Sequence, residues 1–98
     1  MGIFQIKNLA NGKIFIGRGL NVEGKINSAK FQLEQGSHPN SEMQNDFKQH
    51  GAKNFSFEVL DFLDPIKDDL DYDYAEDLVL LEEMWLEKLD PYGEKGYN

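Results

Sequence analysis

One carboxylate stands where the sequence predicts an apolar surface. The spacing of residues 75–89 predicts a helix whose apolar side is formed by Leu78, Val79, Leu81, Trp85, Leu86 and Leu89. At about 100° per residue, Glu82 falls near the centre of that side. Because burial of an unpaired charge is costly, we expect Glu82 either to bind a metal ion or act as a general base, or to pair with a Lys or Arg at the rim of the core. The helical pattern does not decide between these two interpretations.

The opening residues 2–17 predict two short strands joined by a turn. Apolar β-branched and aromatic side chains dominate residues 3–6 and 14–16, and Asn11-Gly12 between them is a strong hairpin signal. A glycine lies at the outer end of each run. Gly2 and Gly17 would therefore allow another group to approach the sheet closely.

The remaining segments predict three helices and a third strand. Helices are expected at residues 21–35, at 41–50 and at 75–89; the first has the apolar stripe Val22, Ile26, Ala29 and Leu33. Ser41 and Gln44 match a capping box at the start of the second helix. Residues 54–63 alternate as a strand that is apolar enough to be central or to be partly covered on both faces.

Residues 64–77 predict an acidic, solvated loop. Calcium binding is excluded, because Tyr74 stands where the loop would need Gly and Leu80 where it would need a bidentate Glu. The whole chain is thus expected to form one α/β (α+β) domain, residues 1–98. Its small three-stranded antiparallel sheet begins with a β-hairpin and is flanked by three helices.

Composition is that of an ordinary folded domain. The chain has 98 residues, of which 40% are apolar, enough for one core. No stretch approaches the roughly 20 apolar residues of a membrane span, and the first residues lack a basic leader. We therefore expect a cytoplasmic protein with no membrane partner. The absence of cysteine excludes disulfides, thiolate metal sites and thiol nucleophiles.

The net charge of −8 is unevenly distributed. Residues 1–53 hold seven Lys or Arg and four Asp or Glu, for +3, whereas residues 54–98 hold three and fourteen, for −11. The total argues against a generic nucleic-acid binder, since phosphate neutralisation supplies most non-specific affinity. The amino-terminal half could still face a phosphate backbone. Alternatively, the acidic half is a solvated surface and the asymmetry has no functional meaning.

Two tripeptides in the hairpin, Gly2-Ile3-Phe4 and Phe15-Ile16-Gly17, resemble the paired signature of the GIY-YIG nucleases, with phenylalanine in place of both tyrosines. The loop Gly36-Ser37-His38, the stretch 44–51, the helix with one inward carboxylate and the terminal Gly96-Tyr97-Asn98 are similar to the homing-endonuclease branch of that family. The resemblance covers nearly the whole chain in order.

This resemblance implies a nuclease that cleaves DNA with one divalent ion, Mg²⁺ or Mn²⁺. In the family a helix glutamate binds the metal, a helix arginine steadies the scissile phosphate and the motif tyrosines help to activate water. The matching positions are Glu82 for the metal ligand, Phe4 and Phe15 for the tyrosines, Lys25 for the arginine, His38 for a histidine near the site, Asn98 for a supporting asparagine and Ala29 for a second histidine.

The departures from the family pattern concern chemistry more than fold. Phe4 and Phe15 keep the aromatic ring but lack the phenolic oxygen that could orient water. Lys25 keeps a positive charge but lacks the planar fork of a guanidinium. General-base and charge-stabilising groups are each worth orders of magnitude in rate, so we expect a degenerate and impaired active site.

Two other side chains could substitute for the missing groups. His38 could act as a general base near neutral pH, and Arg18 could reach a phosphate from the end of a strand. The simpler interpretations, a surface histidine and a solvent-exposed arginine, are favoured by the sequence. Arg18, Lys25 and Lys30 are the candidate contacts to DNA.

Two functions follow from these observations. The leading prediction is a metal-dependent GIY-YIG-type nuclease domain that acts on DNA through a degenerate site. The alternative is a catalytically inactive module of the same fold that binds DNA or a protein partner. A protein partner would use the acidic loop or Phe31, which points away from the apolar stripe of its helix.

Overall fold

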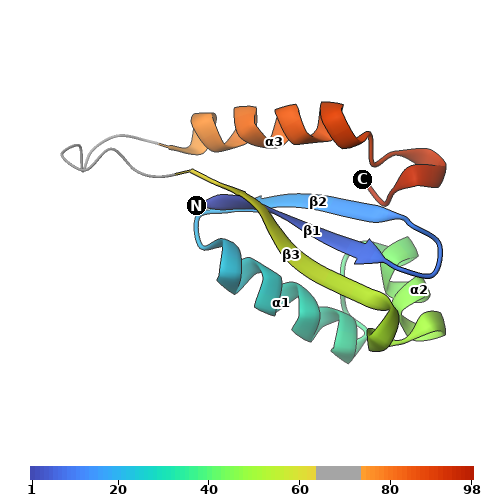
Figure 1. Ribbon diagram of the computed structural model, residues 1–98. Coiled ribbons are helices and arrows are strands. Elements are labelled where there is room, and N and C mark those ends of the chain that lie inside the picture. The colour runs from blue at the N-terminus through green and yellow to red at the C-terminus, as the bar shows by residue number, and fades with distance from the viewer. Residues whose placement is uncertain (64–73) are drawn as a thin grey trace.

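The centre of the fold is a three-stranded antiparallel sheet (Figure 1). The computed structural model describes residues 1–63 and 74–98. Its strands are β1 (Gly2–Asn8), β2 (Ile14–Gly19) and β3 (Phe55–Phe62), in the spatial order β2-β1-β3. The fold class predicted from the sequence is confirmed. Residues 64–73, which hold most of the predicted acidic loop, lie outside the described part of the chain.

Within residues 1–63 and 74–98, three helices flank the sheet. These are α1 (Val22–Gln35), α2 (Ser41–His50) and α3 (Ala75–Leu89), with short 3-10 turns η1 (Ala52–Asn54) and η2 (Gly93–Lys95). Figure 1 shows α1 and α2 on one side of the sheet and α3 on the other. In the described segments, no helix combines the length and apolar character needed to cross a membrane.

The predicted hairpin is present, with a loop longer than two residues. Asn8 closes it, since its N–H donates to the Lys13 carbonyl and its carbonyl accepts from the Gly12 N–H, both at 2.8 Å. Gly12 has φ of +80°, a conformation that favours glycine. The Asn-Gly signal therefore identified the turn correctly, and the strands pair in a register that sets Phe4 opposite Gly17.

Gly17 allows a close approach, as expected, but the approaching group belongs to the protein. A methyl group on Gly17 would lie 2.5 Å from Cζ of Phe4, so the Phe4 ring crosses the space where a side chain would stand. Gly2 is similarly confined by the Asp61 carbonyl, 2.6 Å from where a methyl group would be. At both glycines the space of a side chain is thus taken by the protein's own atoms.

Alternation along the strands produces an apolar cluster on each face of the sheet. On the α1 and α2 side the buried residues are Phe4, Ile6, Val22, Ile26, Ala29, Leu33, Met43, Phe47, Phe55 and Tyr97. On the α3 side they are Ile3, Ile16 and Leu78, joined by partly buried residues that include Leu81, Trp85, Leu86 and Leu89. The predicted apolar stripe of α1 and the apolar face of α3 are therefore both directed into the core.

Two expectations about local structure need correction. β3 is an edge strand, so the option that it is central is wrong, whereas partial cover on both faces is confirmed. The capping box is also wrong, because Asn40 caps α2 and its side chain accepts from the Met43 N–H at 3.0 Å. Asn caps a helix as well as Ser does. The Gln44 amide instead joins the Leu33 carbonyl to the His38 N–H.

Candidate functional site

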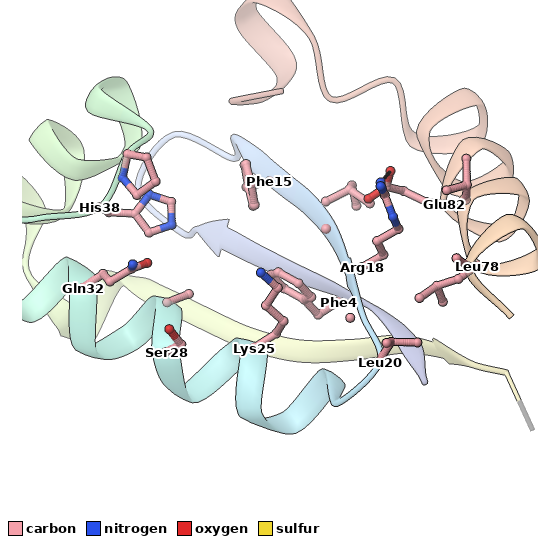
Figure 2. Close-up of a pocket in the computed structure, with 17 residues that line it drawn as sticks. Phe4, Phe15, Arg18, Leu20, Lys25, Ser28, Gln32, His38, Leu78 and Glu82 are labelled. Atoms are coloured by element: carbon pink, nitrogen blue, oxygen red, sulfur yellow. Dashed lines mark hydrogen bonds and ion pairs between the residues drawn. The ribbon is translucent and has the colours of Figure 1, made fainter. Parts of the chain in front are cut away.

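A cleft of about 640 Å³ lies along the outer strand β2. Because β2 is at the edge of the sheet, side chains from both flanking layers reach around it: α1 contributes one wall and α3 the other (Figure 2). The lining residues come from these elements and from the loop before α2; they are Phe4, Phe15–Leu20, Lys25, Ser28, Ala29, Gln32, His38, Pro39, Ala75, Leu78, Val79 and Glu82.

Phe4 and Phe15 form the aromatic part of this cleft. Their ring centroids are 6.3 Å apart with planes tilted by 45°. Phe4 is buried and Phe15 is half-buried. None of the described lining residues is a tyrosine, so no phenolic oxygen enters the cleft from them. Phe4 and Phe15, the positions that the resemblance matches to the motif tyrosines, therefore present only carbon atoms to the cleft.

The α1 wall presents residues spaced by three or four positions, as one helix face requires. Lys25, Ser28, Ala29 and Gln32 line the cleft. The exposed Lys25 stem lies across Gly19, where an added methyl group would come within 2.6 Å of Cγ. Ser28 and Gln32 were not singled out from the sequence, although their spacing from Lys25 could have identified them. Ala29 is buried and carries no functional group.

His38 approaches the cleft with one ring nitrogen already engaged. Its Nδ1 accepts the Asn40 N–H at 3.1 Å, and its ring packs edge-on to Phe15 with centroids 6.0 Å apart. Burial lowers the pKa of His38, which favours the neutral ring. With Nδ1 as an acceptor, the neutral ring carries its proton on Nε2. In this arrangement His38 offers a hydrogen-bond donor, and action as a general base would require loss of the Asn40 bond.

Glu82 on α3 pairs with Arg18 on β2. The Arg18 Nη1 to Glu82 Oε1 distance is 2.7 Å, and 14% of the Glu82 side chain is exposed against 46% of Arg18. Of the two interpretations of Glu82, the ion pair at the core rim is therefore present. Glu82 is also the one carboxylate among the described residues that line the cleft.

Among the described residues that line the cleft, Glu82 is the one carboxylate that could bind a metal ion. In the described part of the chain, no group of three or more His, Asp or Glu side chains forms a ready metal cage. Mg²⁺ is often held by one or two carboxylates, with water and substrate phosphates completing its shell. Glu82 fits that mode of binding, in which a substrate phosphate supplies further ligands.

The two other predicted site residues lie outside the cleft. The Asn98 side chain accepts from the N–H and donates to the carbonyl of Ile16, each at 2.9 Å, so it satisfies both backbone groups of Ile16 at the edge of β2. Lys30 lies beside β3, with Nζ 5.0 Å from the centre of the Phe57 ring. The fold thus brings together Phe4, Phe15, Arg18, Lys25, His38 and Glu82, while Asn98 supports the edge strand and Lys30 stands apart.

Tyr97, next to Asn98, holds the carboxy-terminal residues against the rest of the fold through four hydrogen bonds, a role that was not predicted from the sequence. Its hydroxyl donates to Asp46 at 2.7 Å and accepts from the buried Asn8 amide at 3.1 Å. Its carbonyl accepts from Asn40 at 2.8 Å, and its N–H donates to Ile14 at 2.8 Å. Burial raises the pKa of Tyr97 to about 12. Tyr97 therefore ties β2 to the loop that carries His38.

Replacement Tyr97→Phe is expected to destabilise the protein by about 1–3 kcal/mol near neutral pH, because the buried Asn8 amide loses its acceptor. The folded-state pKa lies above the ordinary value of 10.0. The phenol therefore contributes stability that is fully present below about pH 10 and is lost as pH rises through about 12. Urea unfolding of both proteins at about pH 9 and about pH 11 measures this. The gap between them should shrink at the higher pH, and a constant gap would contradict the burial argument.

Comparison with known proteins gives one curated relative and two similar structures. No family model matches the chain. Intron-associated endonuclease 1 of Enterobacteria phage T4 is 30% identical over 98 residues, which are 99% of this chain and 36% of that protein. The chain thus spans about a third of the length of that relative.

The similar structures cover almost the whole chain. The catalytic domain of the homing endonuclease I-TevI has a TM-score of 0.79 and 28% identity, over 99% of this chain and 95% of that one. A variant of the same domain has a TM-score of 0.76 and 27% identity, over 99% of this chain and 90% of that one. The fold and the resemblance expected from the sequence are confirmed.

Proposed function

We propose, from the confirmed resemblance to the homing-endonuclease branch of the GIY-YIG nucleases, that this chain is a catalytic domain that hydrolyses DNA phosphodiester bonds with one divalent metal ion, Mg²⁺ or Mn²⁺. Its activity is reduced by the loss of the two motif tyrosines and the helix arginine. The observation that carries this proposal is the convergence of Glu82, Arg18, Lys25 and His38 on one cleft at the edge of the sheet.

Each side chain has a role that its position supports. Glu82 would hold the metal ion, which would supply Lewis-acid stabilisation of charge on the reacting phosphate. Lys25 on the α1 wall and Arg18 on β2 attract the DNA backbone to the cleft. The Nε2–H of His38 donates a hydrogen bond to a phosphate oxygen or a bound water. Asn98 keeps β2 in place through its two bonds to Ile16.

The weak point of this mechanism is proton transfer from the attacking water. Phe4 and Phe15 present only carbon at the cleft, and His38 has Nδ1 occupied by the Asn40 N–H. A positioned general base is typically worth about 10²–10⁴ in rate. We therefore propose slow turnover rather than the absence of a site. Incubation of supercoiled plasmid with Mg²⁺ or Mn²⁺, with Glu82→Ala in parallel, tests the proposal.

An inactive binding module of the same fold is the second candidate. Its specific support is the exposed aromatic ring of Phe31, 62% accessible on α1, together with the −11 charge of residues 54–98. Measuring the affinity for duplex DNA at low salt distinguishes a DNA-binding module from a protein-binding module. Absence of measurable DNA binding there would favour a protein partner and would contradict the nuclease proposal.

For DNA binding through the cleft, Arg18→Gln with Lys25→Gln is expected to weaken affinity and to lower the slope of log affinity against log salt by about 2, because two phosphate contacts are lost. Fluorescence anisotropy of a labelled duplex over a range of salt measures both quantities. The double variant Lys53→Gln with Lys88→Gln makes the same change in net charge outside the cleft. Equal effects of the two double variants would show that only net charge matters.

A further inference from the structure

Arg18 forms an ion pair with Glu82, the carboxylate to which a divalent cation would bind. Its Nη1 lies 2.7 Å from Oε1 of Glu82, and both side chains line the same cleft. Arg18 is also the only arginine of the chain, since the other nine cationic residues are lysines. Figure 2 shows the guanidinium reaching from β2 toward α3 and ending at Glu82.

We propose that Arg18 is an exchangeable counter-ion of the active site. In the free protein it neutralises Glu82; when a divalent cation takes that carboxylate, the guanidinium moves to a phosphate of the bound DNA. The cation and the DNA therefore bind cooperatively. The proposal rests on the proposed function, because it assigns the metal ion to Glu82, and it adds a residue that controls when the metal can bind.

Arg18 and a metal ion would compete for the carboxylate of Glu82, because both carry positive charge. A guanidinium on one carboxylate oxygen and a divalent ion on the other would be like charges a few ångströms apart, and their repulsion is strong at the edge of a protein interior. The free protein must therefore give up the Arg18–Glu82 pair to bind a metal ion. The cost of breaking it is modest, because nearly half of the Arg18 side chain is exposed and exposed ion pairs are weak.

The freed guanidinium has a suitable destination in the same cleft. Lys25 lines the opposite wall on α1, so a DNA phosphate in the cleft lies within a region bounded by two cations. A guanidinium offers five N–H donors in a planar fork that matches phosphate oxygens. Arg18 thus supplies from β2 the fork that Lys25 lacks on α1. By linkage, DNA then strengthens metal binding by the same factor as the metal strengthens DNA binding.

The test measures Mn²⁺ affinity without cleavage, by electron paramagnetic resonance of free Mn²⁺ in the absence of DNA. Arg18→Ala is expected to bind Mn²⁺ roughly tenfold more tightly than the wild type, because a resident positive charge is gone. Arg18→Lys, which keeps the charge but loses the fork, should remain near the wild type. Lys53→Gln makes the same change in net charge as Arg18→Ala far from the cleft, and we expect it to change the affinity by less than about twofold.

A second titration with duplex DNA present tests the exchange itself. DNA should increase the Mn²⁺ affinity of the wild type and increase that of Arg18→Ala by a much smaller factor. Far-ultraviolet circular dichroism establishes that each variant is folded.

The failure of the inference and the failure of the proposed function have different signatures. Glu82→Gln should abolish specific Mn²⁺ binding in every background. If it does, but Arg18→Ala binds Mn²⁺ no more tightly than the wild type, Arg18 is a static rim charge and the exchange is wrong while the metal site stands. If Glu82→Gln binds Mn²⁺ as the wild type does, the metal site at Glu82 is wrong, and the exchange with it.

Discussion

Replacement of Glu82 by alanine is expected to lower metal-dependent DNA cleavage by about 10³-fold or more. Metal ions supply several kcal/mol of transition-state stabilisation, and Glu82 is the one carboxylate among the described lining residues that can hold the ion. The measurement is the single-turnover rate of plasmid nicking in saturating Mn²⁺, with the protein in excess over DNA. Because the excess of protein keeps the DNA fully bound, a loss of rate reports on the cleavage step and not on DNA affinity.

Glu83→Ala is the matched control for this experiment. Glu83 lies on the same helix and is exposed to solvent away from the cleft. The substitution Glu83→Ala removes the same charge as Glu82→Ala. It should cleave at the wild-type rate within about twofold. Cleavage that survives Glu82→Ala would exclude the proposed mechanism. Loss in both variants would point instead to a general effect of charge on α3.

Introducing the three groups that the family resemblance leads us to expect should have the second largest effect. The triple variant Phe4→Tyr, Phe15→Tyr and Lys25→Arg should cleave at least about 100-fold faster than the wild type, since general-base and charge-stabilising groups commonly contribute 10²–10⁴ each. All three side chains line the same cleft, so their new polar atoms enter one site. The same single-turnover assay measures the gain.

The gain must depend on the metal ligand if the site is a reduced form of a working nuclease. Adding Glu82→Ala to the triple variant should return cleavage to background. A triple variant that remains folded and binds DNA but gains no rate would contradict the view that the missing groups limit turnover. That outcome would favour a fold retained for binding alone.

Features that depend on neighbouring residues were predictable from the sequence. The four stripe residues of α1, Val22, Ile26, Ala29 and Leu33, are all buried, because helical geometry alone sets which positions share a face. The hairpin was predictable because the Asn11-Gly12 turn signal and the apolar runs on either side of it are close together in the sequence. Resemblance and residue chemistry together identified the candidate site residues, of which the fold places six, Phe4, Phe15, Arg18, Lys25, His38 and Glu82, on one cleft.

Features that depend on competition between similar segments were not predictable. Both β1 and β3 are apolar on two faces, so their sequences do not show which of them is central. Asn40 and Ser41 are both good caps, and the start of α2 is decided by how the Asn40 side chain fits between the Met43 N–H and the Tyr97 carbonyl.

By itself, the sequence determined the order of the elements, the apolar faces that hold them together and the identity of Glu82 as an anomalous carboxylate. Only the tertiary structure decided what that carboxylate meets. Arg18 lies 64 positions earlier in the chain, and Asn98 reaches Ile16 across 82 positions. Such contacts have no local signature, because periodicity assigns a side chain to a face but not to a partner. The pairing of Arg18 with Glu82, on which the proposed control of metal binding rests, arises from packing α3 beside the edge strand β2.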